Sequence, residues 1–553
     1  MQESQVEACA DHRYYAYQHY SLENNILSAV GESAKAGRKN CLNQSLIYLS
    51  LLIHNKDLLI KMIGMEGGTS FVDRTMELAA LGDAYSRKSS LVVIYGRRRL
   101  GKTSLVKRFM EGRRGVYFLF TKEPEHDQLY RLARAVGKAI GSRRLEDFGA
   151  SSFEDLFAEI GESCKSEKLV LALDEFPYLA SQDPTIPSIF QKIWDEYLKG
   201  SNVMLVLTGS SVGMMRSEVL SYSAPLYGRA TAILHLKQMG FKDVSALMPA
   251  GMGFEDRLML YFMFGGVPAY YAALYQGGKA KSYTIERAME AVLAEGAIFA
   301  EEPSVMLSEE VTNDARYLII LSLLAEGVNK PSEIASRLNI AQSNLQKYLT
   351  VLEGIGVVER EFPVTEARKS RSKRGIYAIS DNFTFFYFYV LRKITADLRA
   401  QPAQAAIEAI NLLGRAAPKR FELLVREVVW SLSGSGSLPF TAFSVGRWWG
   451  RNHSKPKGKD EEEIDIMALN PETRDMLVGE AEWRNRKMDI SDYMSLKEKA
   501  KAVEWNDGDR SVYYALFSKA GFTEGMEKMA KEEGVMLFDL DAIERALAGK
   551  STA

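Results

Sequence analysis

A glycine-rich segment, Gly96–Thr103, has the spacing G-x-x-x-x-G-K-T. It follows the apolar run Leu91–Tyr95, which is typical of a buried parallel strand, and it precedes a run with helical spacing. Glycines let the backbone wrap around phosphates, and the helix N-terminus adds partial positive charge. The segment predicts a phosphate loop that binds ATP. The nucleotide-binding candidates are Gly96, Arg97, Arg98, Arg99, Leu100, Gly101, Lys102, Thr103 and Ser104.

Two residues of this loop have side chains suited to phosphoryl transfer. Lys102 supplies a positive charge for the β- and γ-phosphates, and the Thr103 hydroxyl is a ligand for Mg²⁺. The three arginines at the variable positions, Arg97–Arg99, raise the positive potential beside the phosphates. They could equally contact a partner or DNA, and the sequence leaves this open.

A carboxylate that holds Mg²⁺ is expected at the end of a second buried strand. The apolar run Leu169–Leu173 is followed by Asp174 and Glu175. We expect Asp174 to hold the metal through water and Glu175 to orient or deprotonate the attacking water.

A third buried strand, Val203–Thr208, ends in small hydroxyl residues. Thr208 and Ser210 are candidates to face the γ-phosphate or the attacking water, as sensors. Farther along, Arg229 is a candidate arginine finger, in cis or from a neighbouring subunit, with a structural ion pair as the alternative.

These segments together resemble the archaeal-type ATPase family, which is AAA-like and STAND-related. The segments that carry the resemblance are Phe71–Arg74, Tyr95–Thr103, Leu173–Pro177, Leu207–Ser211 and Leu226–Arg229. The resemblance implies a core with a five-stranded parallel sheet and a small helical lid, and it extends from about residue 65 to the end of the chain.

A different pattern of short helices begins near residue 313. The apolar helix Tyr317–Ala325 is followed by Pro331–Leu338, which has proline at a helix N-terminus, and by Ala341–Leu352 with a buried stripe. The segments Val357–Phe362 and Gly375–Ile379 read as two strands of a hairpin. This order predicts a winged helix-turn-helix.

In a winged helix the second helix of the helix-turn-helix enters the DNA major groove. Between the two wing strands, residues 368–374 contain five basic residues and no acidic one, which suits phosphate contacts. The alternative is a solvated loop on a domain that serves only as a protein contact. The candidate DNA contacts are Asn344, Lys347, Arg368, Lys369, Arg371, Lys373 and Arg374. The aromatic run Asp381–Tyr389 is interpreted as core rather than as a base-stacking platform.

Near the C-terminus, carboxylates follow a pattern similar to the PD-(D/E)xK nuclease core. Asp465 lies on one expected strand, and Glu480 and Glu482 lie on the next. Before them come the amphipathic helix Phe421–Trp430 and a possible strand at Phe440–Val445. Such enzymes hold Mg²⁺ between carboxylates and use a lysine. Asp465, Glu480 and the helix residue Glu422 fit the metal positions, but Glu482 occupies the place of the lysine. We therefore expect the nuclease-like fold and leave open whether it cleaves nucleic acid or only binds it.

Composition restricts the class of protein. The chain has 553 residues with 70 basic and 71 acidic side chains, which excludes a uniformly basic nucleic-acid coat. Its three cysteines, Cys9, Cys41 and Cys164, cannot form a disulfide framework and fit a reducing cytoplasm. No apolar stretch approaches the roughly 20 residues of a membrane span.

The expected organisation is α/β: a P-loop NTPase parallel sheet with a helical lid, then a winged helix-turn-helix, then an α/β PD-(D/E)xK nuclease-like domain. The lid is implied by the family resemblance. The expected segments are an N-terminal extension of unclear status (1–64), the ATPase core (65–236), the lid (237–300), the winged helix (305–395) and the nuclease-like domain (405–553).

The expected function is Mg²⁺-dependent ATP binding and hydrolysis, coupled to the winged helix and the nuclease-like effector and directed at nucleic acid. Two alternatives remain: an ATP-gated DNA-binding regulator with negligible hydrolysis, and a metal-dependent nuclease switched by ATP. A homo-oligomer is also left open.

Overall fold

The structure is a computed structural model that describes residues 71–549, except 73, 223, 250, 275–283, 295–298, 300–301, 309, 312–314, 367–373 and 507. The expectation for residues 1–64 lies outside these residues. All described residues belong to one compact unit, Ser70–Ala553.

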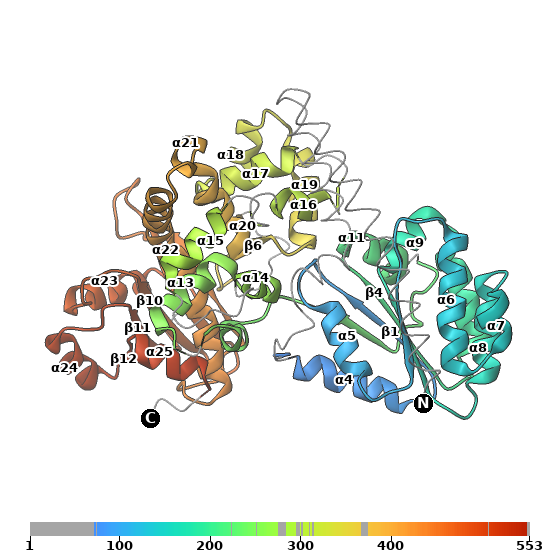
Figure 1. Ribbon diagram of the computed structural model, residues 1–553. Helices are drawn as coiled ribbons and strands as arrows, with labels where there is room; N and C mark the ends of the chain where they lie inside the picture. The colour runs from blue at the N-terminus through green and yellow to red at the C-terminus, as the bar shows by residue number, and fades with distance from the viewer. Residues whose placement is uncertain are drawn as a thin grey trace, which may run out of the picture. The chain divides into compact units, whose positions relative to one another are not determined.

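The first half of the described chain contains a five-stranded parallel sheet (Figure 1). Its strands are β1 (Ser90–Tyr95), β2 (Gly115–Leu119), β3 (Leu169–Asp174), β4 (Val203–Gly209) and β5 (Ala232–His235). Their order is β2-β3-β4-β1-β5, and all four neighbouring pairs are parallel. The parallel sheet implied by the family resemblance is confirmed.

Helices cover both faces of this sheet, which explains why β1, β3 and β4 are buried along their whole length and apolar except at their ends. In β1, Val92 and Ile94 pack with α4 (Thr75–Ser86) and α5 (Lys102–Met110). Leu91 and Val93 belong to the cluster on the other face. The helices on that face are α6 (Glu125–Ile140), α7 (Arg143–Phe148), α8 (Phe153–Ser163), α9 (Phe176–Gln182) and α10 (Ile186–Ile193). Short helical segments follow at η1 (Trp194–Leu198), α11 (Val212–Met215) and η2 (Arg216–Leu220).

Helices follow β5 in the segment expected to form the lid. They are α12 (Phe241–Val244), η3 (Ser245–Leu247), α13 (Phe254–Phe264), α14 (Pro268–Leu274) and α15 (Ile285–Leu293), followed by α16 (Glu302–Ser308).

The predicted winged helix is present. It consists of α17 (Ala315–Ala325), α18 (Pro331–Arg337), α19 (Gln342–Gly354) and the antiparallel hairpin of β6 (Val358–Glu361) and β7 (Ile376–Ile379). The aromatic run then forms α20 (Asn382–Tyr389), with most of its rings buried. The interpretation of this run as core is therefore confirmed.

The chain continues through η5 (Leu391–Lys393) and α21 (Ala396–Arg399) into α22 (Pro402–Gly434), a helix of 33 residues. The helix predicted at Phe421–Trp430 is only the second half of α22. The predicted strand at Phe440–Val445 was placed too early, because the observed strand β8 is Ser444–Arg451.

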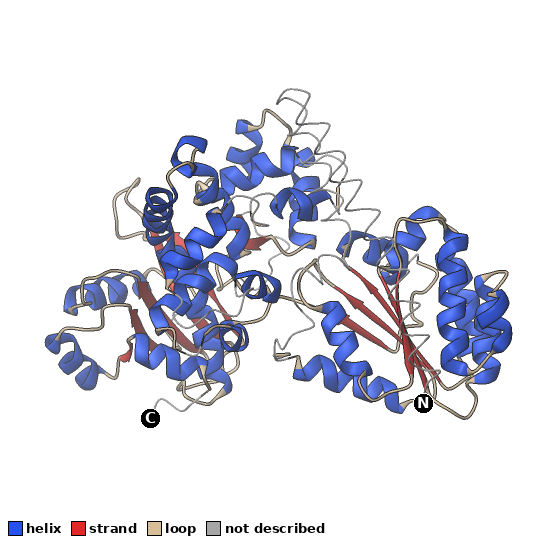
Figure 2. Ribbon diagram, in the orientation of Figure 1, coloured by secondary structure: helices blue, strands red, loops and turns tan. Residues whose placement is uncertain are grey.

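A second five-stranded sheet completes the fold (Figure 2). Its order is β12-β11-β10-β9-β8, with β8, β9 and β10 antiparallel and β10, β11 and β12 parallel. Its other strands are β9 (Glu461–Asn470), β10 (Asp475–Glu482), β11 (Ser511–Ser518) and β12 (Met536–Phe538). One face packs on α22 and α25 (Leu540–Leu547), and the other on α23 (Ile490–Lys501) and α24 (Glu524–Glu533).

One hydrophobic cluster contains side chains from the expected lid, from α20, from α22 and from the second sheet. A second cluster joins one face of the first sheet to the winged helix. Apolar packing therefore crosses the expected domain bounds, which stay a prediction. Among the described residues no helix is long and apolar enough to span a membrane.

The shared packing predicts that α20 contributes strongly to stability. Phe386 is fully buried next to Phe264 and Phe383. Phe386→Ala should lower the free energy of unfolding by about 3–5 kcal/mol, because it removes a buried ring and leaves a cavity. Urea denaturation measures this loss. Phe443→Ala is the matched control, since Phe443 is 57% exposed. Equal loss in both variants would contradict the assignment of α20 to the core.

Candidate functional site

The predicted phosphate loop joins β1 to α5, which begins at Lys102. Gly96 has φ 152°, and a Cβ there would overlap the carbonyl oxygen of Leu236. Gly101, with φ 88°, is the residue that precedes the helix. Both positions therefore require glycine, for space at Gly96 and for backbone conformation at Gly101.

Lys102 is folded against its own loop. Its Nζ donates to the carbonyl oxygens of Gly96 at 2.6 Å and Arg97 at 3.1 Å, and the residue is 6% exposed. The two carbonyl oxygens therefore hold the ammonium group inside the phosphate loop.

Asp174, at the end of β3, accepts hydrogen bonds from hydroxyls on three other elements. The Thr103 Oγ1 donates to its Oδ2 at 2.8 Å, and Tyr117 in β2 donates to the same oxygen at 2.5 Å. Thr208 at the end of β4 donates to Oδ1. The predicted metal residues Thr103 and Asp174 and the predicted sensor Thr208 therefore meet at one edge of the sheet.

Tyr117 is a site residue that the sequence analysis missed. Burial raises its pKa well above the usual range, and the nearby Asp174 charge adds to the shift. The phenol therefore stays protonated and donates to the carboxylate. Its position on β2, opposite Ala172 in β3, follows from strand pairing that no local pattern indicates.

Glu175 has a left-handed backbone, φ 56°, at the start of α9. Its carboxylate is 1% exposed and is held by Ser210. The Ser210 hydroxyl donates to Oε1 at 2.7 Å, and the Ser210 amide donates to Oε2 at 3.0 Å. The second predicted sensor thus contacts the predicted catalytic carboxylate.

Two further candidates lie apart from these contacts. Ser104 is in the first turn of α5, half-buried. Arg229 donates to Asp195, with Nη2 2.7 Å from Oδ2, and to the carbonyl of Pro225. Arg229 therefore forms the structural ion pair that was the alternative to an arginine finger.

Two loop arginines form buried ion pairs with carboxylates distant in sequence. Arg97 lies 2.9 Å from Asp381, and Arg99 lies 2.8 Å from Glu302. Each of these four side chains is less than 10% exposed. The structure places these two arginines against the protein's own acidic groups, an arrangement that was not among the alternatives left open by the sequence. Arg98 is half-buried.

Arg74 ties the phosphate loop to the start of the helices after β5. Its Nη2 donates to the carbonyl oxygens of Leu100 at 3.2 Å and Lys237 at 2.8 Å. Arg74 belongs to the first segment that carries the family resemblance, but its place in the sequence indicated no role for it.

In the winged helix, Asn344 and Lys347 are exposed on α19, as a base or phosphate contact requires. The wing residues Arg368, Lys369, Arg371 and Lys373 lie outside the described residues. Arg374 is described, and it donates to the carbonyl of Trp449 in β8 and lies 3.5 Å from Glu366.

Three predicted carboxylates lie on α22 and on the second sheet, and burial together with the charge of one of them, Asp465, raises the pKa of the other two. Burial raises the pKa of Glu422 and of Glu480 to about 7, and in both cases the charge of Asp465 is the next cause. The pKa of Asp465 is also raised by burial, although its Oδ2 accepts the amide of Ala481 at 3.1 Å. Residues from α22, β9 and β10 thus form one acidic cluster.

Lys499 supplies a cation that the sequence analysis did not find. It lies on α23, and its Nζ is 2.7 and 3.0 Å from the two carboxylate oxygens of Glu480. Glu482 pairs with Arg484 instead of joining the cluster. The only signal in the sequence was a lysine-rich helix after the second strand.

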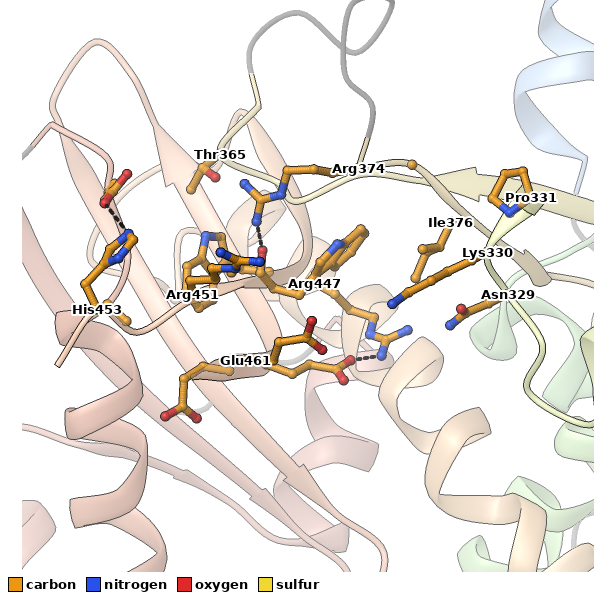
Figure 3. Close-up of a pocket in the computed structure, with 18 of the residues that line it drawn as sticks. Asn329, Lys330, Pro331, Thr365, Arg374, Ile376, Arg447, Arg451, His453 and Glu461 are labelled. Atoms are coloured by element: carbon orange, nitrogen blue, oxygen red, sulfur yellow. Dashed lines mark hydrogen bonds and ion pairs between the residues drawn. The ribbon is translucent and has the colours of Figure 1, made fainter. Parts of the chain in front are cut away.

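A groove of about 900 Å³ lies between the winged helix and the second sheet (Figure 3). Lys330 and Arg374 line it from the winged helix, and Arg447 and Arg451 line it from β8. Arg447 pairs with Glu463 in the groove and lies 3.8 Å from Glu422 of the acidic cluster. The groove therefore combines both signs of charge and opens beside that cluster.

No group of three or more histidine, cysteine or acidic residues in the described chain has a geometry that could hold a metal ion, so Glu422, Asp465 and Glu480 do not together form the metal site expected from the sequence. The donor set at Thr103 and Asp174 nevertheless suits Mg²⁺, which prefers one or two oxygen ligands from protein together with substrate phosphates.

Three family models match the chain. Residues 71–274 match an ATPase domain predominantly from Archaea. Residues 315–360 match a bacterial regulatory protein family, the arsR family. Residues 386–499 match archaeal and bacterial proteins of unknown function.

Among curated proteins, the uncharacterized protein MJECL04 of Methanocaldococcus jannaschii is 31% identical over 477 residues, which are 85% of this chain and 99% of that protein. The uncharacterized ATP-binding protein MJ0423 of the same organism is 43% identical over 51 residues, 9% of this chain and 86% of that protein.

Two solved structures resemble the chain distantly. The Walker-type ATPase PABY2304 of Pyrococcus abyssi is 20% identical, with 58% of this chain and 96% of that chain covered and a TM-score of 0.42. The ORC2 protein of Aeropyrum pernix is 16% identical, with 62% and 97% covered and a TM-score of 0.37. At these scores neither structure supports a statement about function.

The acidic cluster predicts a pH-dependent cost in stability. A carboxyl group whose folded pKa is raised favours folding when protonated, so its effect turns unfavourable as pH rises from the unfolded pKa, near 4.5, through about 7. Glu422→Gln should therefore stabilise the protein by on the order of 2 kcal/mol at pH 8 and by little at pH 5. Urea denaturation at both pH values tests this. An increase in the free energy of unfolding that does not change with pH would show that the pKa of Glu422 is not raised in the folded protein.

Proposed function

Since the chain belongs to the same family as MJECL04 of M. jannaschii and carries an archaeal ATPase-type domain and a helix-turn-helix segment, we propose that it binds and hydrolyses ATP with Mg²⁺. The nucleotide state would act on the winged helix and on the C-terminal module, and through them on nucleic acid. The observation that carries the proposal is the 2.8 Å contact between Thr103 and Asp174.

Phosphate binding is assigned to the loop Gly96–Thr103 and to the N-terminus of α5. The main-chain amides and the helix dipole favour an anion at this point. Lys102, already held against the loop, adds a full positive charge for the β- and γ-phosphates.

The metal is assigned to the oxygen donors at the edge of the sheet. Thr103 and Asp174 would hold Mg²⁺, which supplies charge neutralisation for the phosphates. Tyr117 and Thr208 orient the Asp174 carboxylate by their hydrogen bonds.

Water activation is assigned to Glu175. Its amide donates to Oδ1 of Asp174 at 3.0 Å, so the residue adjoins the proposed metal ligand. Ser210 fixes it through its hydroxyl and its amide, which limits the directions in which the carboxylate can accept a proton.

Replacement of Lys102 or Glu175 separates binding from hydrolysis. Lys102→Ala should abolish tight ATP binding, because the loop loses its full charge. Glu175→Gln should bind ATP normally and lower turnover at least about 100-fold, since glutamine can still bond to Ser210 but cannot accept the proton. Calorimetry and phosphate release measure the two properties. Turnover by Glu175→Gln at the wild-type rate would contradict this role.

An ATP-gated DNA-binding regulator remains the alternative for the whole chain, favoured by the exposed Asn344 and Lys347 on α19. In that case hydrolysis would be negligible with and without DNA. Phosphate release measured across DNA and RNA ligands separates the two functions. A homo-oligomer and the nucleic-acid target stay open in both.

A second candidate activity is metal-dependent nucleic-acid cleavage in the C-terminal module, which the sequence pattern similar to PD-(D/E)xK nucleases led us to expect. The specific observation in its favour is Lys499, which reaches Glu480 from α23 and offers the cation missing at Glu482. The groove supports it further, because Arg447 could neutralise a phosphodiester close to Glu422.

If this activity exists, Asp465→Ala should eliminate cleavage of plasmid DNA in Mg²⁺ or Mn²⁺, and Lys499→Ala should reduce it at least about 100-fold. Gel electrophoresis of the plasmid measures both. Glu472→Ala is the control, because Glu472 is an exposed acid in the turn after β9 and does not line the groove. Equal cutting by wild type and Asp465→Ala would indicate a contaminating nuclease.

A further inference from the structure

The phosphate loop is held from outside by residues at both ends of the winged helix. Asp381 follows the last wing strand and pairs with Arg97, and Glu302 in α16 precedes the winged helix and pairs with Arg99. All four groups are buried, so each pair is removed from water and its breakage leaves an uncompensated charge.

Arg99 has a feature that gives its ion pair a specific task. Its backbone is left-handed, with φ 68°, in a loop where the neighbouring Gly96 and Gly101 also have positive φ. A non-glycine residue pays for this conformation, and it persists only where surrounding contacts enforce it. The contacts present are the ion pair with Glu302 and the Tyr270 ring, 5.9 Å from the guanidinium. Tyr270 in turn donates to Glu302 at 3.1 Å.

Asp381 joins the loop to three other segments at once. Its Oδ1 accepts the amide of Thr384 at 2.6 Å and so caps α20. Its Oδ2 accepts from Gln238, which also bonds to the amide of Gly266. A movement of Arg97 that displaces Asp381 therefore also disturbs its hydrogen bonds to Gln238, at the start of the lid segment, and to Thr384, at the N-terminus of α20.

From these contacts we propose that Glu302 and Asp381 are positioning residues for ATP. Through Arg99 and Arg97 they hold the phosphate loop in its conformation, and they make nucleotide binding and docking of the winged helix depend on each other. This inference rests on the proposed ATP site and adds its regulation. Because coupling between two equilibria is reciprocal, ATP stabilises the docking to the same degree that docking strengthens ATP binding.

Two conservative variants remove the charges and keep the contacts with Tyr270 and Thr384. Asp381→Asn also loses the hydrogen bond from Gln238, because an amide nitrogen cannot accept it. Glu302→Gln keeps an acceptor for Tyr270. Asp381→Asn keeps a good helix cap for α20. Each should weaken binding of magnesium-complexed ATP about tenfold in calorimetry, since the loop is no longer held in its strained conformation.

Hydrogen exchange distinguishes a positioning role from a purely structural one, because only a positioning role links ATP binding to the exchange rates of amides outside the phosphate loop. In the wild type, ATP should slow amide exchange in α16 and α20. In both variants this protection by ATP should disappear. Glu361→Gln is the matched control: Glu361 is equally buried, pairs with Arg426 and Arg447, and makes no contact with the phosphate loop. It should change ATP affinity less than twofold.

A glycine at position 99 tests the physical cause. Glycine adopts the left-handed conformation without help, so Glu302→Gln should change ATP affinity less than twofold when it is added to Arg99→Gly. This double variant also removes both members of the buried pair, so it tests the idea even if Glu302→Gln alone folds poorly.

The outcomes separate the two ideas. ATP binding by the wild type with unchanged affinity and protection in Glu302→Gln and Asp381→Asn would overturn the positioning role and leave the ATP site intact. A tenfold effect of Glu302→Gln that persists in the Arg99→Gly background would overturn it as well. No binding by the folded wild type would overturn the proposed function and this inference with it.

Discussion

The structure of the candidate site depends on the contact between the loop that follows β1 and the carboxyl end of β3. Thr103 follows β1 by way of the phosphate loop, and Asp174 ends β3, with β4 between the two strands in the sheet. Parallel strands bring their carboxyl ends to one edge, so a loop after one strand can reach an acid at the end of another. The hydrogen bond from Thr103 to Asp174 is this contact between the two strand ends. Tyr117 in β2 and Thr208 in β4 donate two more hydrogen bonds to the same carboxylate.

Contiguous patterns predicted this part of the molecule well. The strand, loop and helix around Lys102 are local in sequence, and a buried strand that ends in Asp174 and Glu175 is equally local. The parallel order of the strands then brings the pieces together without further information. The winged helix followed in the same way, because its helices and hairpin are each set by short-range spacing.

What could not be predicted were partners that depend on tertiary packing. Nothing around Asp381 or Glu302 distinguishes them from other acids in the chain, and their arginines lie some two to three hundred residues earlier. Lys499 was missed for a related reason, since a lysine on a helix reaches Glu480 only once α23 has packed on the sheet. The errors at α22 and β8 were errors of boundary, where the local pattern is weakest.

The buried charges around the loop are better explained by geometry than by stability. Buried ion pairs are often no more stabilising than apolar residues of similar size, but removing one partner is costly. A leucine in place of Arg99 could fill the same space, yet it could not select Glu302 from the acids nearby. An ion pair accepts few arrangements, and that restriction matters where a loop must present its amides to one ligand. The cost of burying Arg97, Arg99, Asp381 and Glu302 is thus intelligible as the cost of a defined loop conformation. Glu302 precedes the winged helix and Asp381 follows its last strand. The loop conformation and the placement of the winged helix therefore depend on the same two ion pairs.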